Sequence, residues 1–170
     1  MGLLRDQIEQ KAKSLGFEFF KVAKAEKMHP ERERLENWLN NCFHGKMSYM
    51  ENHFELRTDP TKLVPGAKSV ICLAYNYFTD QKARDENAPK ISMYAHGKDY
   101  HLLLKKKLYE LIDFIKEIAG DIDGRVFVDS GPVLERDWAK RAGMGWTGKN
   151  TLLINPKRGS YFFLAELILD

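Results

Sequence analysis

The chain has 170 residues, of which 44% are apolar and 30% charged, and its formal net charge of +3 is too small to indicate nucleic acid by itself. This is typical of one globular domain, and the widely separated Cys42 and Cys72 exclude a disulfide framework or a cysteine metal site. No apolar run reaches the length of a membrane span and the N-terminus carries charge too early for a signal peptide, so we expect a cytoplasmic protein without a membrane partner.

The first half of the chain combines helical and strand-like periodicity. Apolar spacing predicts helices at residues 3–15 and 31–42, and strand-like runs predict strands at 17–23 and 69–77. Between the second helix and the second strand we expect a short helical piece or loop at 47–54 and, from its Pro and Gly signals, a turn at 59–66. Gly16 stands where a residue after a helix end belongs.

The second half begins with a polar segment, 79–90, that we expect to be a mobile loop. We then expect a long helix at residues 98–119, a short strand at 125–128 and a helix at 132–141. Two strands follow, at 151–154 and 161–169. Because this order lacks a strict βαβ rhythm, it favours an α+β fold, with a mixed or antiparallel sheet sandwich and flanking helices. The chain stops on an apolar strand, so we expect residues 1–170 to be one domain of a longer protein.

A glycine-rich segment follows the helix expected at 132–141 and resembles two nucleotide-binding motifs. Gly143, Gly145 and Gly148 spell G-x-G-x-x-G, and residues 143–149 spell G-x-x-x-x-G-K. A dinucleotide motif opens a helix, whereas this one follows a helix. A P-loop needs Ser or Thr where Asn150 stands. Both nucleotide readings therefore fail.

Two readings of the glycine segment remain open. The glycines turn the chain from helix to strand, or they let backbone N–H groups approach a ligand closely. The second reading is supported by Trp146, Thr147, Lys149 and Asn150, which provide a flat wall, hydrogen-bonding groups and a cation. Such a lining suits a bulky ligand with rings, amides and phosphate.

Asp129 ends a short strand at a Ser-Gly-Pro turn. Buried beside an apolar ligand, its carboxyl would have a raised pKa and could act as a general acid. The alternative is a cap for the helix expected at 132–141, for which Ser130 is the better-placed residue.

A polar and aromatic cluster at 93–101 precedes the long helix and contains two His and two Tyr around Gly97. Its backbone N–H groups could face an anion, or Asp99 could simply cap the helix. Arg57 either pairs with Asp59 or reaches into a site. The run at Lys105 to Lys107 is read as a solvated helix face, with RNA phosphate contact as the minor alternative.

Ordered motifs along nearly the whole chain resemble the N-terminal region of the epoxyqueuosine reductase family. They are WL at 38–39, HGKM at 44–47, RTDP at 57–60, LVPGAKSV at 63–70, YA at 94–95, GKDYH at 97–101, VDS at 128–130, PVLER at 132–136, RAG at 141–143, GW at 145–146, GKN at 148–150 and GS at 159–160.

The resemblance implies a nitroreductase-like sandwich that binds cobalamin base-off, in an enzyme that reduces epoxyqueuosine to queuosine at the tRNA wobble position. It implies that Asp129 is the proton donor, that two [4Fe–4S] clusters relay electrons, and that the partners are tRNA with a GUN-type anticodon and an electron donor protein. The cofactor-binding residues implied are Arg57, Ser92, Tyr94, Lys98, Tyr100, His101, Ser130, Trp146, Gly148, Lys149, Asn150 and Ser160.

The sequence departs from the family in one respect, because the cysteine-rich cluster region and helical-repeat tail would follow residue 170. Two cysteines cannot hold two clusters, so we expect a fragment that does not turn over alone. We also expect the protein to be a monomer. A cobalamin carrier without chemistry and a flavin-binding nitroreductase relative are the alternative functions.

Overall fold

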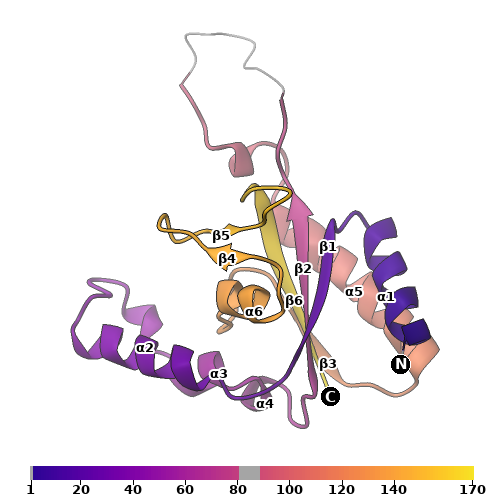
Figure 1. The fold of residues 1–170 in the computed structure, drawn as a ribbon, viewed down its shortest axis with the longest axis horizontal. Helices are drawn as coiled ribbons and strands as arrows, with labels where there is room; N and C mark the ends of the chain where they lie inside the picture. Colours follow the sequence, from indigo (N-terminus) through magenta and orange to yellow (C-terminus); the bar gives the residue numbers. More distant parts are fainter. Residues whose placement is uncertain (1, 81–88) are drawn as a thin grey trace.

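Four antiparallel strands form the sheet at the centre of the molecule, with helices on both of its faces (Figure 1). The structure is a computed structural model that describes residues 2–80 and 89–170. The strand order across the sheet is β1-β2-β6-β3. These strands are β1 (Phe19–Lys24), β2 (Ser69–Asn76), β3 (Gly124–Phe127) and β6 (Phe162–Leu169).

The two long strands, β2 and β6, lie at the centre of the sheet. Their ladder runs from Ser69 opposite Leu169 to Asn76 opposite Phe162. Because both faces of the sheet are covered, most side chains of these two strands are apolar on either side. This explains why both strands are near-continuous apolar runs in the sequence.

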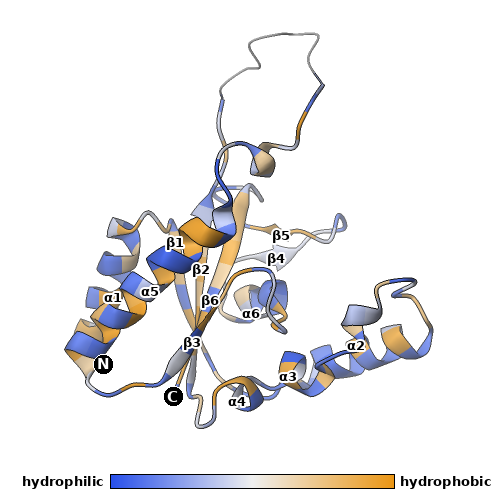
Figure 2. Cartoon of the chain, turned by 180° about the vertical axis from the view of Figure 1, so that it is seen from behind, coloured by the Kyte–Doolittle hydropathy of each residue, from blue (hydrophilic) through white to orange (hydrophobic). Residues whose placement is uncertain are grey.

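Helices α1 (Gly2–Ser14) and α5 (Tyr100–Ala119) cover one face, as Figure 2 shows from behind. The buried stripe of α5 packs with the inward residues of α1 and of the sheet. Asp99 caps α5, because its carboxylate accepts the backbone N–H of His101. The long helix therefore begins two residues after the expected start, at Tyr100.

The opposite face carries α6 (Glu135–Arg141) and a small hairpin formed by β4 (Trp146–Thr147) and β5 (Leu153–Ile154). Trp138 of α6 is fully buried in this second core. The remaining helices are α2 (His29–Asn40), α3 (Phe54–Thr58) and α4 (Pro60–Leu63), with 3₁₀ turns at Ser48–Met50 and Met93–Ala95. Ion pairs Arg34–Asp137 and Arg141–Glu31 join α2 to α6.

The α+β class expected from the sequence is confirmed, and the sheet is antiparallel throughout. Gly16 and Gly143 follow α1 and α6 with φ of 92° and 78°, the conformation expected after a helix end. Two short helices, α3 and α4, occupy the region that contains the expected turn. The loop expected at 79–90 falls mostly on 81–88, outside the described residues. None of the described helices is long and apolar enough to cross a membrane.

Candidate active site

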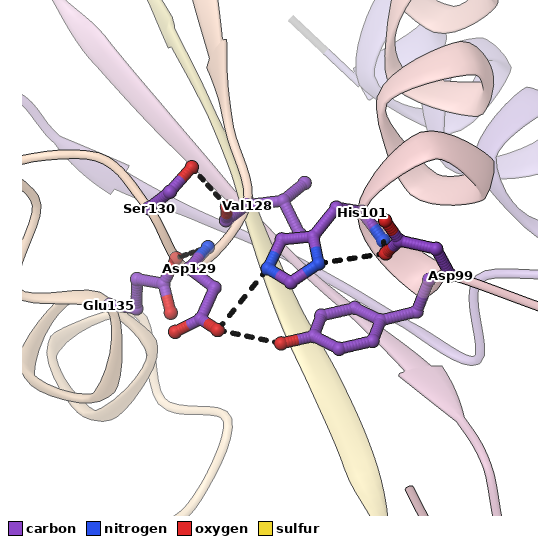
Figure 3. Close-up of polar contacts among 7 residues, drawn as sticks. Asp99, His101, Val128, Asp129, Ser130 and Glu135 are labelled. Atoms are coloured by element: carbon purple, nitrogen blue, oxygen red, sulfur yellow. Dashed lines mark hydrogen bonds and ion pairs between the residues drawn. The ribbon is translucent and has the colours of Figure 1, made fainter. Parts of the chain in front are cut away.

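Asp129 lies just beyond β3, with its carboxylate facing the N-terminal end of α5 (Figure 3). The Tyr100 hydroxyl donates a hydrogen bond to Asp129 Oδ2 over 2.6 Å, and His101 Nε2 lies 3.4 Å from the same oxygen. The other ring nitrogen of His101, Nδ1, is 2.9 Å from Asp99 Oδ1. A histidine thus bridges two carboxylates, an arrangement suited to moving a proton.

The expected cap of α6 is wrong for both candidates. The helix begins at Glu135, not Pro132, after Leu134, which contributes no side-chain cap. Ser130 instead donates to the Val128 carbonyl oxygen over 3.4 Å. Residues 131–134, which precede the helix, are not helical, and Val133 among them is buried in the core.

The side chain of Asp129 is 62% exposed, so the chain itself does not supply the apolar burial that the sequence argument required. A second, half-buried carboxyl at this site belongs to Glu135, whose Oε1 accepts the backbone N–H of Asp129 over 2.5 Å. Burial raises the pKa of Glu135 to about 7, against the lowering effect of that hydrogen bond. A carboxyl that changes charge near neutral pH is therefore present, next to the predicted one.

Tyr100 is held in a stack of rings. Its ring lies 3.9 Å from that of Phe163, nearly parallel, and 4.0 Å from the His101 ring, and Tyr77 packs against Phe163 at 4.6 Å. Burial, and then the hydrogen bond to the Asp129 carboxylate, raise the pKa of Tyr100. Its hydroxyl is therefore a neutral, fixed donor to Asp129.

Asp129 lines a cleft of about 820 Å³, and a second cleft of about 540 Å³ adjoins it, since Tyr77, Tyr94 and Leu152 line both. Of the predicted binding residues, Arg57, Tyr94, Tyr100 and His101 line the first cleft, and Ser92, Tyr94, Asn150 and Ser160 line the second. The structure thus gathers residues from five separate segments around one pair of clefts.

Arg57 reaches the first cleft and does not pair with Asp59. Its guanidinium donates to the carbonyl oxygens of Asn52 and Tyr49, both over 3.2 Å, while Asp59 caps α4 by accepting from Thr61 N–H. Burial lowers the pKa of Arg57, although a guanidinium remains charged at any physiological pH. A fixed cation therefore borders the cleft.

Five predicted binding residues line neither cleft: Lys98, Ser130, Trp146, Gly148 and Lys149. Trp146 belongs to β4 and is about half exposed. Gly145 has a structural role, because it allows close packing of the backbone: a Cβ at this position would lie 2.1 Å from the Ile154 carbonyl oxygen. The chain-turning interpretation is thus supported at Gly143 and Gly145, while ligand binding by this segment stays a prediction.

Comparisons with known proteins match these features. A family model described as epoxyqueuosine reductase QueG, DUF1730, matches residues 57–130, which include Arg57, Tyr100 and Asp129. The epoxyqueuosine reductase of Cyclobacterium marinum is 53% identical over 164 residues, covering 96% of this chain and 53% of that protein. The chain matches epoxyqueuosine reductases over nearly its whole length. It spans about half the length of the curated relatives it matches.

Solved epoxyqueuosine reductases share the fold. The structure from Streptococcus thermophilus is 28% identical with a TM-score of 0.88, covering 99% of this chain and 46% of that one. Another, in complex with an epoxyqueuosine-modified tRNA-Tyr stem loop, is 31% identical with a TM-score of 0.84, covering 98% and 45%. At the level of fold alone, a reductive dehalogenase described with a B12-dependent mechanism matches at 14% identity, with a TM-score of 0.54 and coverage of 96% and 19%.

Two carboxyls of interest, Glu135 and Glu166, were not predicted from the sequence. Glu166 lies on the central strand β6 and is fully buried, and neither carboxyl oxygen has a hydrogen-bond partner among residues 2–80 and 89–170. Burial, and then the charge of Glu135, raise its pKa well above the usual value. The sequence feature that could have indicated Glu166 is its position as the one charged residue in the apolar run of residues 162–169.

Glu166→Leu is expected to increase the free energy of unfolding by about 2 kcal/mol at pH 8, because it removes an unpartnered buried carboxyl. Since the folded-state pKa of Glu166 is raised, its destabilising effect is absent below the unfolded-state pKa of about 4.5 and grows as pH rises. The gain should therefore be smaller at pH 4. Urea unfolding at both pH values measures it.

Glu166→Gln is the matched control, because it cannot ionise but keeps two polar atoms of similar shape. We expect it to recover only part of the gain of the leucine variant at pH 8. A leucine variant less stable than the wild type at pH 8 would contradict this account of Glu166.

Proposed function

We propose that this chain is the cobalamin-binding catalytic domain, residues 1–170, of an enzyme that reduces epoxyqueuosine to queuosine at the wobble position of tRNA, with Asp129 as proton donor. The observation that carries the proposal is the Asp129 carboxylate, held by Tyr100 and His101 at the edge of the large cleft. The tRNA stem loop bound by a relative supports the substrate class.

The residues around the clefts fit cobalamin, a large flat ring system with amide arms and a nucleotide tail. Aromatic rings of Tyr77, Tyr94 and Phe163 and the Arg57 cation border the first cleft. Hydroxyl and amide groups of Ser92, Asn150 and Ser160 border the second, where they could bind amide arms or the tail. The B12-dependent dehalogenase that shares the fold supports this assignment.

When bound, cobalamin supplies electrons from low-valent cobalt. The residues of this chain orient the epoxide and transfer protons. Conversion of an epoxide to an alkene consumes two electrons and two protons and releases water, so the departing oxygen must be protonated. Asp129, in its protonated form, would deliver that proton, and His101 between Asp129 and Asp99 would restore it from the surface. Tyr100 keeps the Asp129 carboxyl in place.

The electrons would arrive through two [4Fe–4S] clusters outside these 170 residues. Each cluster needs about four thiolates, whereas this chain has only Cys42 and the buried Cys72. We propose that the remaining part of a longer, monomeric protein holds the clusters, receives electrons from a donor protein, and completes the surface for tRNA with a GUN-type anticodon. Such a substrate supports a cytoplasmic location.

Cobalamin binding tests the first part of the proposal. Hydroxocobalamin and, separately, flavin mononucleotide are added to the purified protein, and bound ligand is read from the visible spectrum after gel filtration. We expect bound cobalamin with the spectrum of the base-off form, and no bound flavin. Bound flavin without cobalamin would favour a nitroreductase-like protein and overturn the assignment.

A further inference from the structure

The backbone of Asp129 has an uncommon conformation. Its φ is 57°, in the left-handed region that residues other than glycine seldom adopt, with Asn and Asp the usual exceptions. In this conformation the side chain contacts Tyr100 and His101, and Figure 3 shows it facing His101. Because the conformation is disfavoured, some neighbouring contact must hold it.

Glu135 provides that contact. It is the first residue of α6, and its side chain reaches back to the loop after β3, where Oε1 accepts the Asp129 N–H over 2.5 Å. A hydrogen bond to a carboxylate is about twice as strong as one to a neutral acceptor. The hydrogen bond from the Asp129 N–H to Glu135 is therefore stronger when the Glu135 carboxyl is ionised.

The groups facing Glu135 come from four elements. His101 at the start of α5 and Arg136 of α6 favour its charged form, as does the Asp129 N–H. The charge of Asp129 opposes it, and Glu166 of β6 lies close enough for its own pKa to be raised by Glu135. Tyr100, also on α5, contributes a neutral hydroxyl whose pKa the Glu135 charge helps to raise.

Glu166 lies in the core of the sheet face that carries α6, and its carboxyl has no hydrogen-bond partner in the part of the chain that the structure describes. It is thus best accommodated as a neutral acid. Burial of Glu135 beside a second carboxyl works against its charge, and burial is the largest cause of its raised pKa of about 7. Glu135 would therefore be charged above that pH and neutral below it.

We propose that Glu135 is a positioning residue: its carboxylate holds the Asp129 amide in the left-handed conformation, and protonation of Glu135 loosens the loop that carries Asp129. This deepens the function proposed above, on which it rests, by naming the residue that sets the geometry of its proton donor. The Asp129 carboxyl is then aimed at Tyr100 and His101 more firmly at pH 8 than at pH 6.

Hydrogen-exchange mass spectrometry of the peptide covering residues 128–134 tests the proposal in the intact protein, without cofactor or substrate. At pH 8 the wild type is expected to exchange about tenfold more slowly than Glu135→Gln, because the variant keeps an acceptor oxygen but never carries charge. At pH 6 the two proteins should exchange alike. Comparison at equal pH removes the intrinsic pH dependence of exchange.

Glu135→Ala removes the acceptor entirely and should exchange fastest at both pH values. Peptides covering residues 69–76 of β2 report any general loosening and should be unchanged in the glutamine variant. Equal exchange of wild type and Glu135→Gln at pH 8 would overturn the proposal, as would a difference that is the same at pH 6. Because exchange needs no turnover, this result is independent of whether the enzyme reduces epoxyqueuosine.

Discussion

Asp129→Asn is expected to lower epoxide reduction by about 10²- to 10⁴-fold in the full-length enzyme, the usual contribution of a positioned general acid. Asparagine adopts the left-handed conformation readily, and its side-chain oxygen can still accept from Tyr100, so the geometry around φ 57° should persist. Only the transferable proton is lost. Single-turnover formation of queuosine in tRNA measures the rate, and the visible spectrum measures bound cobalamin.

Asp113→Asn is the matched control for Asp129→Asn, because Asp113 lies exposed on α5 outside both clefts. It should retain the wild-type rate. Wild-type turnover in Asp129→Asn would show that another group supplies the proton. Loss of cobalamin binding in Asp129→Asn would mean that the carboxylate holds the cofactor instead of acting as an acid.

Gly145→Ala is expected to reduce the free energy of unfolding by about 3 kcal/mol, at the upper end of overpacking costs. The new Cβ would lie 2.1 Å from the Ile154 carbonyl oxygen and 2.8 Å from its carbon, and backbone atoms cannot move aside cheaply. The β4–β5 hairpin must then open or shift. Chemical unfolding, followed by circular dichroism, measures the loss.

Gly143→Ala provides the comparison for Gly145→Ala, because a Cβ there would meet nothing within 4 Å. Its φ of 78° alone should cost about 1 kcal/mol. If the two variants lose equal stability, close backbone packing is not the reason for a glycine at 145. A Gly145→Ala protein as stable as the wild type would contradict the account directly.

Local patterns in the sequence predicted the elements whose signals are local. The apolar stripe of α5, the β-branched run of β2 and the glycine after α6 depend on nearest neighbours along the chain. The failure of the nucleotide motifs was also readable, because a helix before Gly143 is a local feature. Several of the residues proposed for the site came from the resemblance to a known family. That resemblance indicated which residues far apart in the sequence share a site, and periodicity does not carry this information.

Contacts between distant segments escaped prediction. Whether Asp129 caps a helix depends on where α6 begins, and the structure places that start at Glu135, two residues after Val133, which is buried among residues of other segments. The pKa of Glu135 depends on burial and on groups of α5 and β6 as well as on its own helix. No local pattern contains that information, so the carboxyl that titrates near neutral pH was found only in three dimensions.

The central place of β6 has a consequence for how the molecule is made. This strand holds β2 on one side and β3 on the other, although it follows β2 by more than 80 residues. During synthesis the sheet cannot close until residues 162–169 have left the ribosome. Until then the edge of β2 that pairs with β6 has no partner, because β1 pairs with the opposite edge, and an unpaired apolar strand edge favours aggregation.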